Sequence, residues 1–498
     1  MNSQYEKLMR HVEKTEAIKA ALTLFGWDTE TLAPPAAVEF TSRVMGTLSS
    51  CYREAVMEDE VKELIAALCE HKDLSAGQAA VVRKMKKERE NLEKIPPKEY
   101  REFCELQARA TTVWAKVKRQ GDYESFAPVL EKILDYCRRF AGYRKKEGQS
   151  LYDAMLDEYE ESFTKEVLDP FFASLKKEIV PLLKQVTKKN GTIDRGPLHA
   201  SFDVNRQKEF NRYLAGYLGF DAQRGVMAES EHPFTTSLHN HDVRITNHYY
   251  ENRLDSAIFS VIHEAGHGIY EMNVDDALTL TPAGGGASCG MHESQSRLME
   301  NMIGRSPAFW TPLYPKLKET FPDQLSDVTL DSFVRMINKA EPGLIRTQAD
   351  ELTYCLHVMI RYEIEKELID GDLGVKELPQ VWNRKYEEYL GIRPQNDTEG
   401  VLQDVHWSQG SIGYFPSYAL GNAFAAQICH AMEQEIDVEG ALLKGEMSVI
   451  TDWLREKVHR FGQMKTSREL LRDITGEDFN PRYYLDYLIR KYTKVYAL

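Results

Sequence analysis

Two histidines and a glutamate stand close together in IFSVIHEAGHGIYE, residues 258–271. His263 and His267 are four residues apart, so on a helix their imidazoles lie one turn apart and can converge on one point. Glu264 lies about 100° around the helix from His263, beside that point. Two imidazoles with a neighbouring carboxylate can hold a zinc ion and accept a proton from water. The segment therefore predicts a zinc site of the metallopeptidase type, with Glu264 as general base.

The alternative is an amphipathic helix that only turns a polar face to solvent. In either case the apolar stripe would consist of Ile258, Ile262, Ala265 and Ile269. Gly266 and Gly268 argue against the solvated face, because each glycine costs roughly 1 kcal/mol in a helix interior relative to alanine. They suit a helix that another backbone approaches closely, as inside a packed site.

A zinc site with an open position needs a third protein ligand. The segment CGMHESQSRLMEN, residues 289–301, offers Cys289, His292 and Glu293. In one class of zinc peptidase a glutamate ligand lies on a second helix about two dozen residues further on, which favours Glu293. Spacing alone leaves the other two residues open. Arg297 stands where an orienting aspartate is common, so Glu300, on the same helix face as Glu293, is the candidate to orient a zinc histidine.

The elements that must position these residues are predicted to be mostly helices. Apolar residues recur at three- and four-residue spacing through the first 190 residues, with breaks near the prolines at 34–35, 96–97 and 197 and at 188–192. The helical pattern resumes after residue 291.

Between residues 230 and 290, glycine, proline, histidine and asparagine become frequent. Alternation in DVRIT (242–246) predicts a short strand, and LTLT (278–281) is a second candidate. PAGGGASCG (282–290) reads as a flexible loop. We therefore expect a mainly α fold with a small β-sheet near the zinc site.

The composition excludes several partners. The chain has 498 residues and a formal net charge of −14, which argues against nucleic acid and an anionic membrane surface as binding partners.

No signal peptide and no run of about 18 apolar residues is visible. The seven cysteines show no CxxC spacing, so free buried thiols in the cytoplasm are the simplest interpretation.

Several motifs together resemble the carboxypeptidase Taq family, the M32 zinc metallocarboxypeptidases. In chain order they are WDTETLAPP (27–35), HPF (232–234), DVRIT, HEAGH (263–267), HESQSR (292–297), IRTQAD (345–350) and GVLQDVHW (400–407). The resemblance implies a helical, two-lobed, saddle-like subunit with a deep central groove, and a homodimer. It also implies release of C-terminal amino acids from peptides with broad specificity and poor action on proline.

The resemblance also assigns residues. The zinc ligands become His263, His267 and Glu293, and Glu264 the general base. Arg346 is similar to the residue that binds the terminal carboxylate of the substrate. His232 and His406 are similar to residues that contact the substrate or the oxyanion. Tyr414 and Tyr418 are similar to tyrosines that stabilise a transition state, and Tyr418 is favoured. We expect one metallocarboxypeptidase unit over 1–498, with a helical N-terminal portion at 1–195 and a catalytic portion at 196–498.

The expected reaction is hydrolysis of the last peptide bond by a zinc-activated water, with one Zn²⁺ per chain that Co²⁺ can replace. Its substrates would be peptides with a free C-terminus.

The edge of the DVRIT strand could pair with the peptide backbone. Arg244 in that strand is the second candidate for the carboxylate, whereas Arg346 is expected in the first turns of a helix, held by Asp350. The rival functions are an internally cutting oligopeptidase and a non-enzymatic helical interaction protein.

Overall fold

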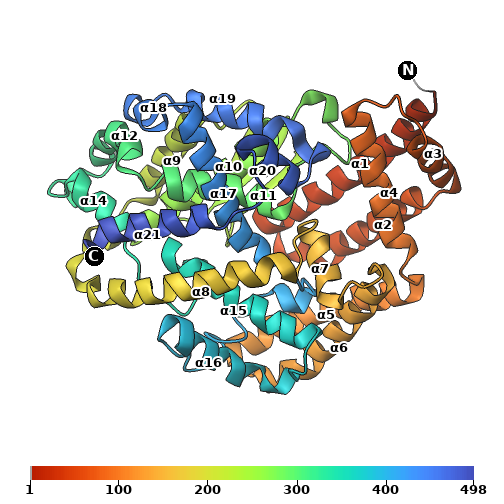
Figure 1. Ribbon diagram of the computed structural model, residues 1–498, viewed down its shortest axis with the longest axis horizontal. Helices are drawn as coiled ribbons and strands as arrows, with labels where there is room; N and C mark the ends of the chain where they lie inside the picture. Colours follow the sequence, from red (N-terminus) through yellow and green to blue (C-terminus); the bar gives the residue numbers. More distant parts are fainter. Residues whose placement is uncertain (1–2) are drawn as a thin grey trace. The chain divides into compact units, whose positions relative to one another are not determined.

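The computed structural model describes residues 3–498 (Figure 1). The chain divides into two compact units. Unit 1 comprises the chain up to Glu93, Asp194–Ile337 and Ala425–Phe479. Unit 2 comprises Lys94–Ile193, Asn338–Phe424 and the chain from Asn480 to the end. Each unit is built from three separate segments, so neither is continuous along the sequence. The predicted division at residue 195 into a scaffold and a catalytic portion stays a prediction.

Both units are mainly helical, as predicted. The helices of unit 1 are α1 (Ser3–Thr31), α2 (Val38–Val56), α3 (Asp59–Cys69), α4 (Ala76–Glu93), α9 (Val204–Leu218), α10 (Leu254–Met272), α11 (Cys289–Arg297), α12 (Pro307–Thr320), α13 (Pro322–Leu325), α14 (Leu330–Ile337), α18 (Val438–Lys444), α19 (Met447–Lys457) and α20 (Ser467–Thr475). Those of unit 2 are α5 (Pro97–Gln120), α6 (Tyr123–Arg144), α7 (Leu151–Tyr159), α8 (Lys165–Lys188), α15 (Glu351–Ile369), α16 (Leu378–Leu390) and α21 (Arg482–Tyr496). The unit boundary falls inside α17 (Pro416–Glu435).

Prolines and caps set the helix ends where the sequence predicts them. The helix α4 ends at Glu93, and α5 begins at Pro97, where the missing N–H of proline costs no hydrogen bond. The helix α1 ends at Thr31, before Pro34 and Pro35. Two of the predicted breaks thus coincide with observed helix boundaries.

Unit 1 contains a three-stranded sheet beside α10. Its strands are β1 (Gly225–Glu229), β2 (Thr235–His239) and β3 (Asp242–Asn247), in the order β1-β3-β2. The strand predicted at 242–246 is confirmed as β3, which pairs in parallel with β1 and antiparallel with β2. Because β3 is the central strand, it has no free edge, and the expectation that a substrate backbone pairs with it is wrong. Val243 and Ile245 are buried on one face, as the alternation predicted.

The second candidate strand, at 278–281, does not form. A 3₁₀ turn ends at Leu278, and Leu280 has a left-handed backbone with φ of 52°. Thr281 then folds back, because both its amide and its hydroxyl donate to the carbonyl of Leu278. A short run of alternating leucine and threonine therefore makes a tight turn, since no neighbouring strand takes up its backbone groups.

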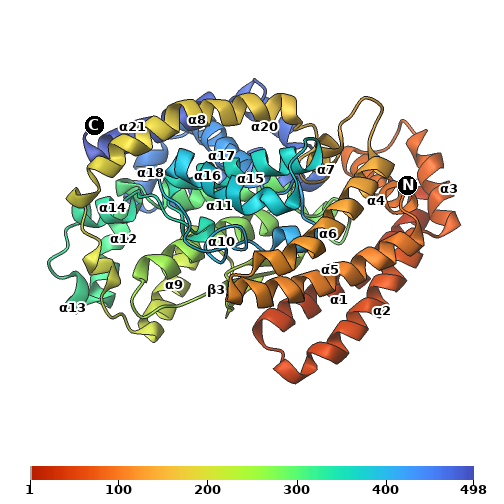
Figure 2. The ribbon, with the colours of Figure 1, turned by 90° about the horizontal axis from the view of Figure 1, so that it is seen from below.

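Each unit has its own apolar core. In unit 1, α1 lies beside α2 (Figures 1 and 2), and α1, α3 and α4 enclose buried side chains that include Leu8, Val12 and Leu68. In unit 2, α8 packs against α15, α16 and α21, and it buries Phe171 and Phe172. These cores are made of hydrocarbon side chains, the main source of folding free energy.

All seven cysteines are free. Cys137 and Cys355 are buried, but Cys51, Cys69 and Cys104 are exposed, so the expectation of buried thiols holds only for some of them. Among residues 3–498, no helix is both long enough and apolar enough to cross a lipid bilayer.

Candidate metal centre

Helix α10 carries the HEAGH segment with the predicted orientation. The apolar stripe is buried in the core, with at most 3 % of any member exposed: Ile258, Ile262, Ala265 and Ile269. His263 and His267 lie on the other side, with ring centroids 4.9 Å apart. The spacing of four residues therefore brings the two imidazoles together, as helical geometry requires.

Gly266 lets α11 approach the histidines. A Cβ atom at Gly266 would lie 2.7 Å from Ser296 Cα and 2.8 Å from Gln295 O, both in the backbone of α11. The inference of a close backbone approach is therefore confirmed at this position. At Gly268 the near neighbours are the side chains of Phe220 and Ile245 instead. The contact at Gly266 holds α11, and with it Glu293, against the histidine face of α10.

His263, His267 and Glu293 form one group that could hold a metal ion, with one ligand atom of each within 4.8 Å of the others. Glu293 Oε2 lies 3.8 Å from His263 Nε2 and 3.5 Å from His267 Nε2. Two imidazole nitrogens and one carboxylate oxygen are a donor set that suits zinc and leaves a coordination position open. With both imidazoles neutral, a divalent ion would leave the site with a net charge near +1. Neither Cys289 nor His292 belongs to this group.

The outer nitrogen of His263 bonds to Glu300, the residue that sequence reasoning singled out for this role. His263 Nδ1 lies 2.9 Å from Glu300 Oε2. Glu300 stands on a π-helical turn, Leu298–Ile303, that continues α11. Arg297 and Arg305 each approach a Glu300 oxygen, at 3.1 and 3.0 Å. Their charges compensate a carboxylate that is only 9 % exposed.

Arg297 also pairs with the metal-ligand candidate Glu293. Its Nε donates to Glu293 Oε1 over 2.7 Å, so Oε2 is the oxygen left facing the histidines. Burial alone would raise the pKa of Glu293, but Arg297 and the two histidines outweigh burial and hold the pKa well below its usual range. The arginine that replaces the common aspartate thus keeps Glu293 ionised.

Glu264 has a different environment. It is 6 % exposed, and its Oε2 accepts a hydrogen bond of 2.6 Å from the Thr235 hydroxyl, at the start of β2. Burial raises the pKa of Glu264, and the nearby His263 and Thr235 offset part of that effect. A carboxylate that is hard to keep ionised is a good proton acceptor. Thr235 could not be predicted from the sequence, because its contact depends on the sheet lying beside α10.

Several other candidate residues lie together within unit 2, around Arg346. Arg346 is 5 % exposed and stands in a 3₁₀ turn, Arg346–Gln348. Its Nε and Nη2 approach Asp404 Oδ1 at 3.0 and 2.9 Å, and its Nη1 donates to the Tyr354 hydroxyl over 3.0 Å. The expectation that Asp350 holds this arginine is wrong. Asp350 caps α15 by accepting from the amides of Leu352 and Thr353.

His406 and the two tyrosines accompany Arg346 in unit 2. His406 Nε2 lies 3.3 Å from the Tyr418 hydroxyl, and the Arg346 guanidinium lies 4.9 Å from the centre of the Tyr418 ring. The Tyr414 and Tyr418 rings are in edge contact at 5.2 Å. Burial, together with the charge of Arg346, lowers the pKa of His406 to about 4, so its imidazole is neutral near pH 7. The group thus places a guanidinium that is paired with Asp404 beside a neutral imidazole and two tyrosine rings.

The remaining candidates, Arg244 and His232, lie near the sheet of unit 1. Arg244 forms a two-point ion pair with Asp242, at 2.8 Å for both Nε and Nη2, and its guanidinium stacks 4.8 Å from the Trp27 ring. Two of its five N–H groups are therefore taken up by Asp242. His232 is exposed between β1 and β2, where its carbonyl accepts from the Ser230 hydroxyl.

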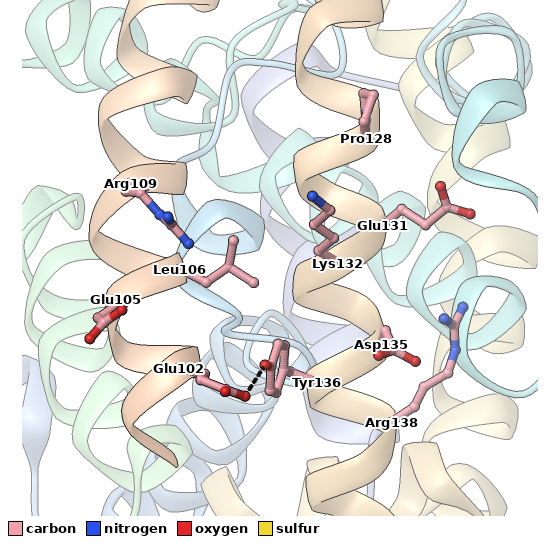
Figure 3. Close-up of a pocket in the computed structure, with 10 residues that line it drawn as sticks. All are labelled: Glu102, Glu105, Leu106, Arg109, Pro128, Glu131, Lys132, Asp135, Tyr136 and Arg138. Atoms are coloured by element: carbon pink, nitrogen blue, oxygen red, sulfur yellow. Dashed lines mark hydrogen bonds between the residues drawn. The ribbon is translucent and has the colours of Figure 1, made fainter. Parts of the chain in front are cut away.

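A hollow of about 660 Å³ lies elsewhere, between α5 and α6 of unit 2 (Figure 3). Charged side chains of both signs line it, among them Glu105, Arg109 and Lys132, and the Tyr136 hydroxyl donates to Glu102 across it. None of the residues predicted from the sequence lines this hollow. Its mixed charges and open position give no reason to assign chemistry to it.

The chain matches known proteins over nearly its whole length. Residues 7–492 match the family model of the carboxypeptidase Taq (M32) metallopeptidases. The chain is 45 % identical over 480 residues to carboxypeptidase 1 of Bacillus subtilis, covering 96 % of each chain, and 34 % identical over 494 residues to thermostable carboxypeptidase 1 of Pyrococcus furiosus, covering 99 % of each. A crystal structure of the M32 carboxypeptidase from Deinococcus radiodurans superposes with a TM-score of 0.97 at 36 % identity, over all of both chains.

These matches agree with the histidine and glutamate group on α10 and α11, and they extend through both units rather than over one motif. The chain therefore belongs to the carboxypeptidase Taq (M32) family of metallopeptidases and is a metallocarboxypeptidase.

Proposed function

We propose that this metallocarboxypeptidase holds one zinc ion on His263, His267 and Glu293 and releases amino acids one at a time from the C-terminus of peptides. The observation that carries the proposal is the convergence of the three ligand atoms within 4.8 Å, with Glu264 in the same helical turn. When bound, zinc lowers the pKa of a water molecule and polarises the carbonyl group of the peptide bond.

Glu264 acts as the general base. Its carboxylate takes a proton from the attacking water and delivers the proton to the leaving nitrogen of the peptide bond. The hydroxyl of Thr235 orients Glu264 through the hydrogen bond to Oε2. Burial supports this role, because it makes proton uptake by Glu264 easier than uptake by an exposed glutamate.

Arg346 binds the terminal carboxylate of the substrate. A guanidinium carries five N–H groups, and the contacts with Asp404 and Tyr354 involve one each on Nε, Nη1 and Nη2. One N–H therefore remains on Nη1 and another on Nη2. Two donors on the terminal nitrogens suit the two oxygens of a carboxylate. By the same count Arg244 keeps three N–H groups beside its two-point pair with Asp242, so it stays the second candidate.

Tyr418 stabilises the oxyanion of the transition state, with Tyr414 as the alternative, and His406 and His232 contact the substrate. A neutral His406 can donate one hydrogen bond without adding charge. We further propose broad side-chain tolerance with poor action on proline, a homodimer and a cytoplasmic location. These four properties rest on the family resemblance and on the free cysteines.

Metal reconstitution tests the proposal. Protein stripped of metal should take up one Zn²⁺ per chain and regain peptide hydrolysis, and Co²⁺ should replace Zn²⁺. The variant His263→Ala should lose both properties. As the control, His248→Ala should keep them, because the His248 ring bonds to the Ser230 carbonyl and His248 does not belong to the metal group. Metal-free protein with full activity would rule the proposal out.

A further inference from the structure

The two histidines of the metal group have different partners on their outer nitrogens. His263 Nδ1 bonds to a carboxylate, that of Glu300. His267 Nδ1 bonds instead to another imidazole, with His292 Nδ1 2.6 Å away. The other ring nitrogen of His292 lies 2.8 Å from Glu271 Oε1. Sequence reasoning considered His292 only as a metal ligand, but both of its nitrogens are used in this chain of contacts.

Only one arrangement of protons satisfies this chain when His267 ligates a metal. His267 Nε2 faces Glu293, so its lone pair must be free for the metal and its proton must sit on Nδ1. His267 Nδ1–H then donates to His292 Nδ1. It follows that His292 carries its proton on Nε2 and donates it to Glu271. Every donor in the chain meets an acceptor, and the chain ends on a carboxylate.

The backbone geometry supports the same chain. His267 and Glu271 are four residues apart on α10, so they share one face of that helix. His292, on α11, bridges the two. Glu271 is 6 % exposed, and its Oε1 also accepts a hydrogen bond of 2.9 Å from the amide of Gly286. The glycine loop before α11 is thus tied to the end of the chain.

That loop is also shaped around His292. A Cβ atom at Gly286 would lie 2.6 Å from His292 Cδ2 and 2.9 Å from Tyr270 Cε1. At the neighbouring Gly285 the nearest atom would be 3.6 Å away, an ordinary contact. Neither glycine has a positive φ. Glycine is therefore needed at 286 for space, but not at 285.

We propose that His292 and Glu271 are positioning residues for the metal, which fix the ring orientation of His267, and that Gly286 seats His292 in place. The inference rests on the proposed metal role of His267. An outer partner on a ligating histidine fixes its orientation and increases the affinity of the site for metal. The metal group is therefore asymmetric. His263 is held by the ion-paired carboxylate of Glu300, and His267 is held through the imidazole of His292.

The test measures the dissociation constant for Zn²⁺ by chelator competition, together with the thermal unfolding midpoint of the metal-free protein. We expect His292→Leu and Gly286→Ala each to weaken Zn²⁺ binding about 10- to 100-fold, the usual effect of losing such a partner. The matched controls are Gly285→Ala, beside Gly286, and His248→Leu. His248 is a half-buried histidine that takes no part in the hydrogen bonds from His267 to Glu271. Both controls should bind Zn²⁺ as tightly as the wild type.

A merely structural role would lower the midpoint of the metal-free protein without changing the Zn²⁺ dissociation constant of the folded fraction. Unchanged affinity in His292→Leu, with the wild type binding one Zn²⁺, overturns the inference but leaves the proposed function intact. A wild type that binds no Zn²⁺ overturns both. If His292→Leu does not fold, His292→Gln and Gly286→Ala decide. The glutamine keeps one acceptor and one donor, so it should bind more tightly than Gly286→Ala, and wild-type affinity in Gly286→Ala overturns the inference.

Discussion

Two buried glutamates on neighbouring helices have opposite electrostatic environments. Glu293 pairs with Arg297, which keeps its pKa low and its charge available for a metal ion. The carboxylate of Glu264 accepts a hydrogen bond from the Thr235 hydroxyl, and burial raises its pKa. Carboxylates whose pKa values are pushed apart can take separate roles in one site, one as ligand and one as proton acceptor.

Removing the charge of Glu264 tests its role. Glu264→Gln keeps the size of the side chain and can still accept from Thr235, but it cannot take up the proton. We expect kcat to fall by at least about 10²-fold, the usual scale of general-base catalysis, while one metal ion per chain stays bound. Steady-state kinetics with metal analysis checks this. Near-normal turnover in a metal-loaded variant would exclude Glu264 as the base.

Arg346 and Arg244 are the two candidates to bind the terminal carboxylate of the substrate, and substitution of each tests the assignment. For Arg346→Ala we expect a loss of about 2 kcal/mol or more in transition-state binding of free-acid peptides, measured from kcat/KM, because a charged hydrogen-bonding pair is lost. Any residual cleavage of amidated peptides should be affected much less. Arg244→Ala should affect both substrates equally, since Arg244 is paired with Asp242. Equal losses on both substrates for Arg346→Ala would assign it a structural role.

The periodicity of the sequence predicted α10 and the positions of its histidines, because helix geometry depends only on local spacing. Sheet order is not local. Nothing in DVRIT says that two other strands flank it, so β3 was expected at an edge. The partner of Arg346 was predicted wrongly for a similar reason. Asp404, and not Asp350, orients this arginine, and Asp404 lies 58 residues further along the chain.

The packing of α10 on α11 can be tested at Gly266. Gly266→Ala places a methyl group within 3 Å of the α11 backbone, so we expect a loss of about 1–3 kcal/mol in the free energy of unfolding, as for other overpacked cores. Weaker metal binding should accompany the loss, because Glu293 stands on α11. Denaturant unfolding and metal titration measure the two effects.

The control is Gly46→Ala in the middle of α2, where a Cβ atom meets nothing within 4 Å. That change should stabilise the protein by up to about 1 kcal/mol, the helix-propensity difference between the two residues. Equal stabilisation by Gly266→Ala would contradict the close approach of the two helices.

We expect both units to fold without a metal ion, because their cores are made of apolar side chains. The buried cluster of unit 1 around Leu8, Val12 and Leu68 is apolar, and most of its members lie on α1, α3 and α4. The segment between α10 and α11 adds Val274, Leu278 and Ala283, but no residue of the metal group belongs to the cluster. Chelation should therefore abolish activity and leave the helical circular dichroism signal largely unchanged. Loss of the helical signal at the same chelator concentration would show that the metal is structural.

The most direct test of a metal-dependent carboxypeptidase is a time course of products from one peptide and its C-terminally amidated twin, followed by mass spectrometry. We expect successive loss of single residues from the C-terminus of the free-acid peptide, no comparable loss from the amide, and no reaction of either peptide after chelation. Internal fragments, or equal cleavage of the two peptides, would contradict carboxypeptidase action and indicate an oligopeptidase that cuts within the peptide.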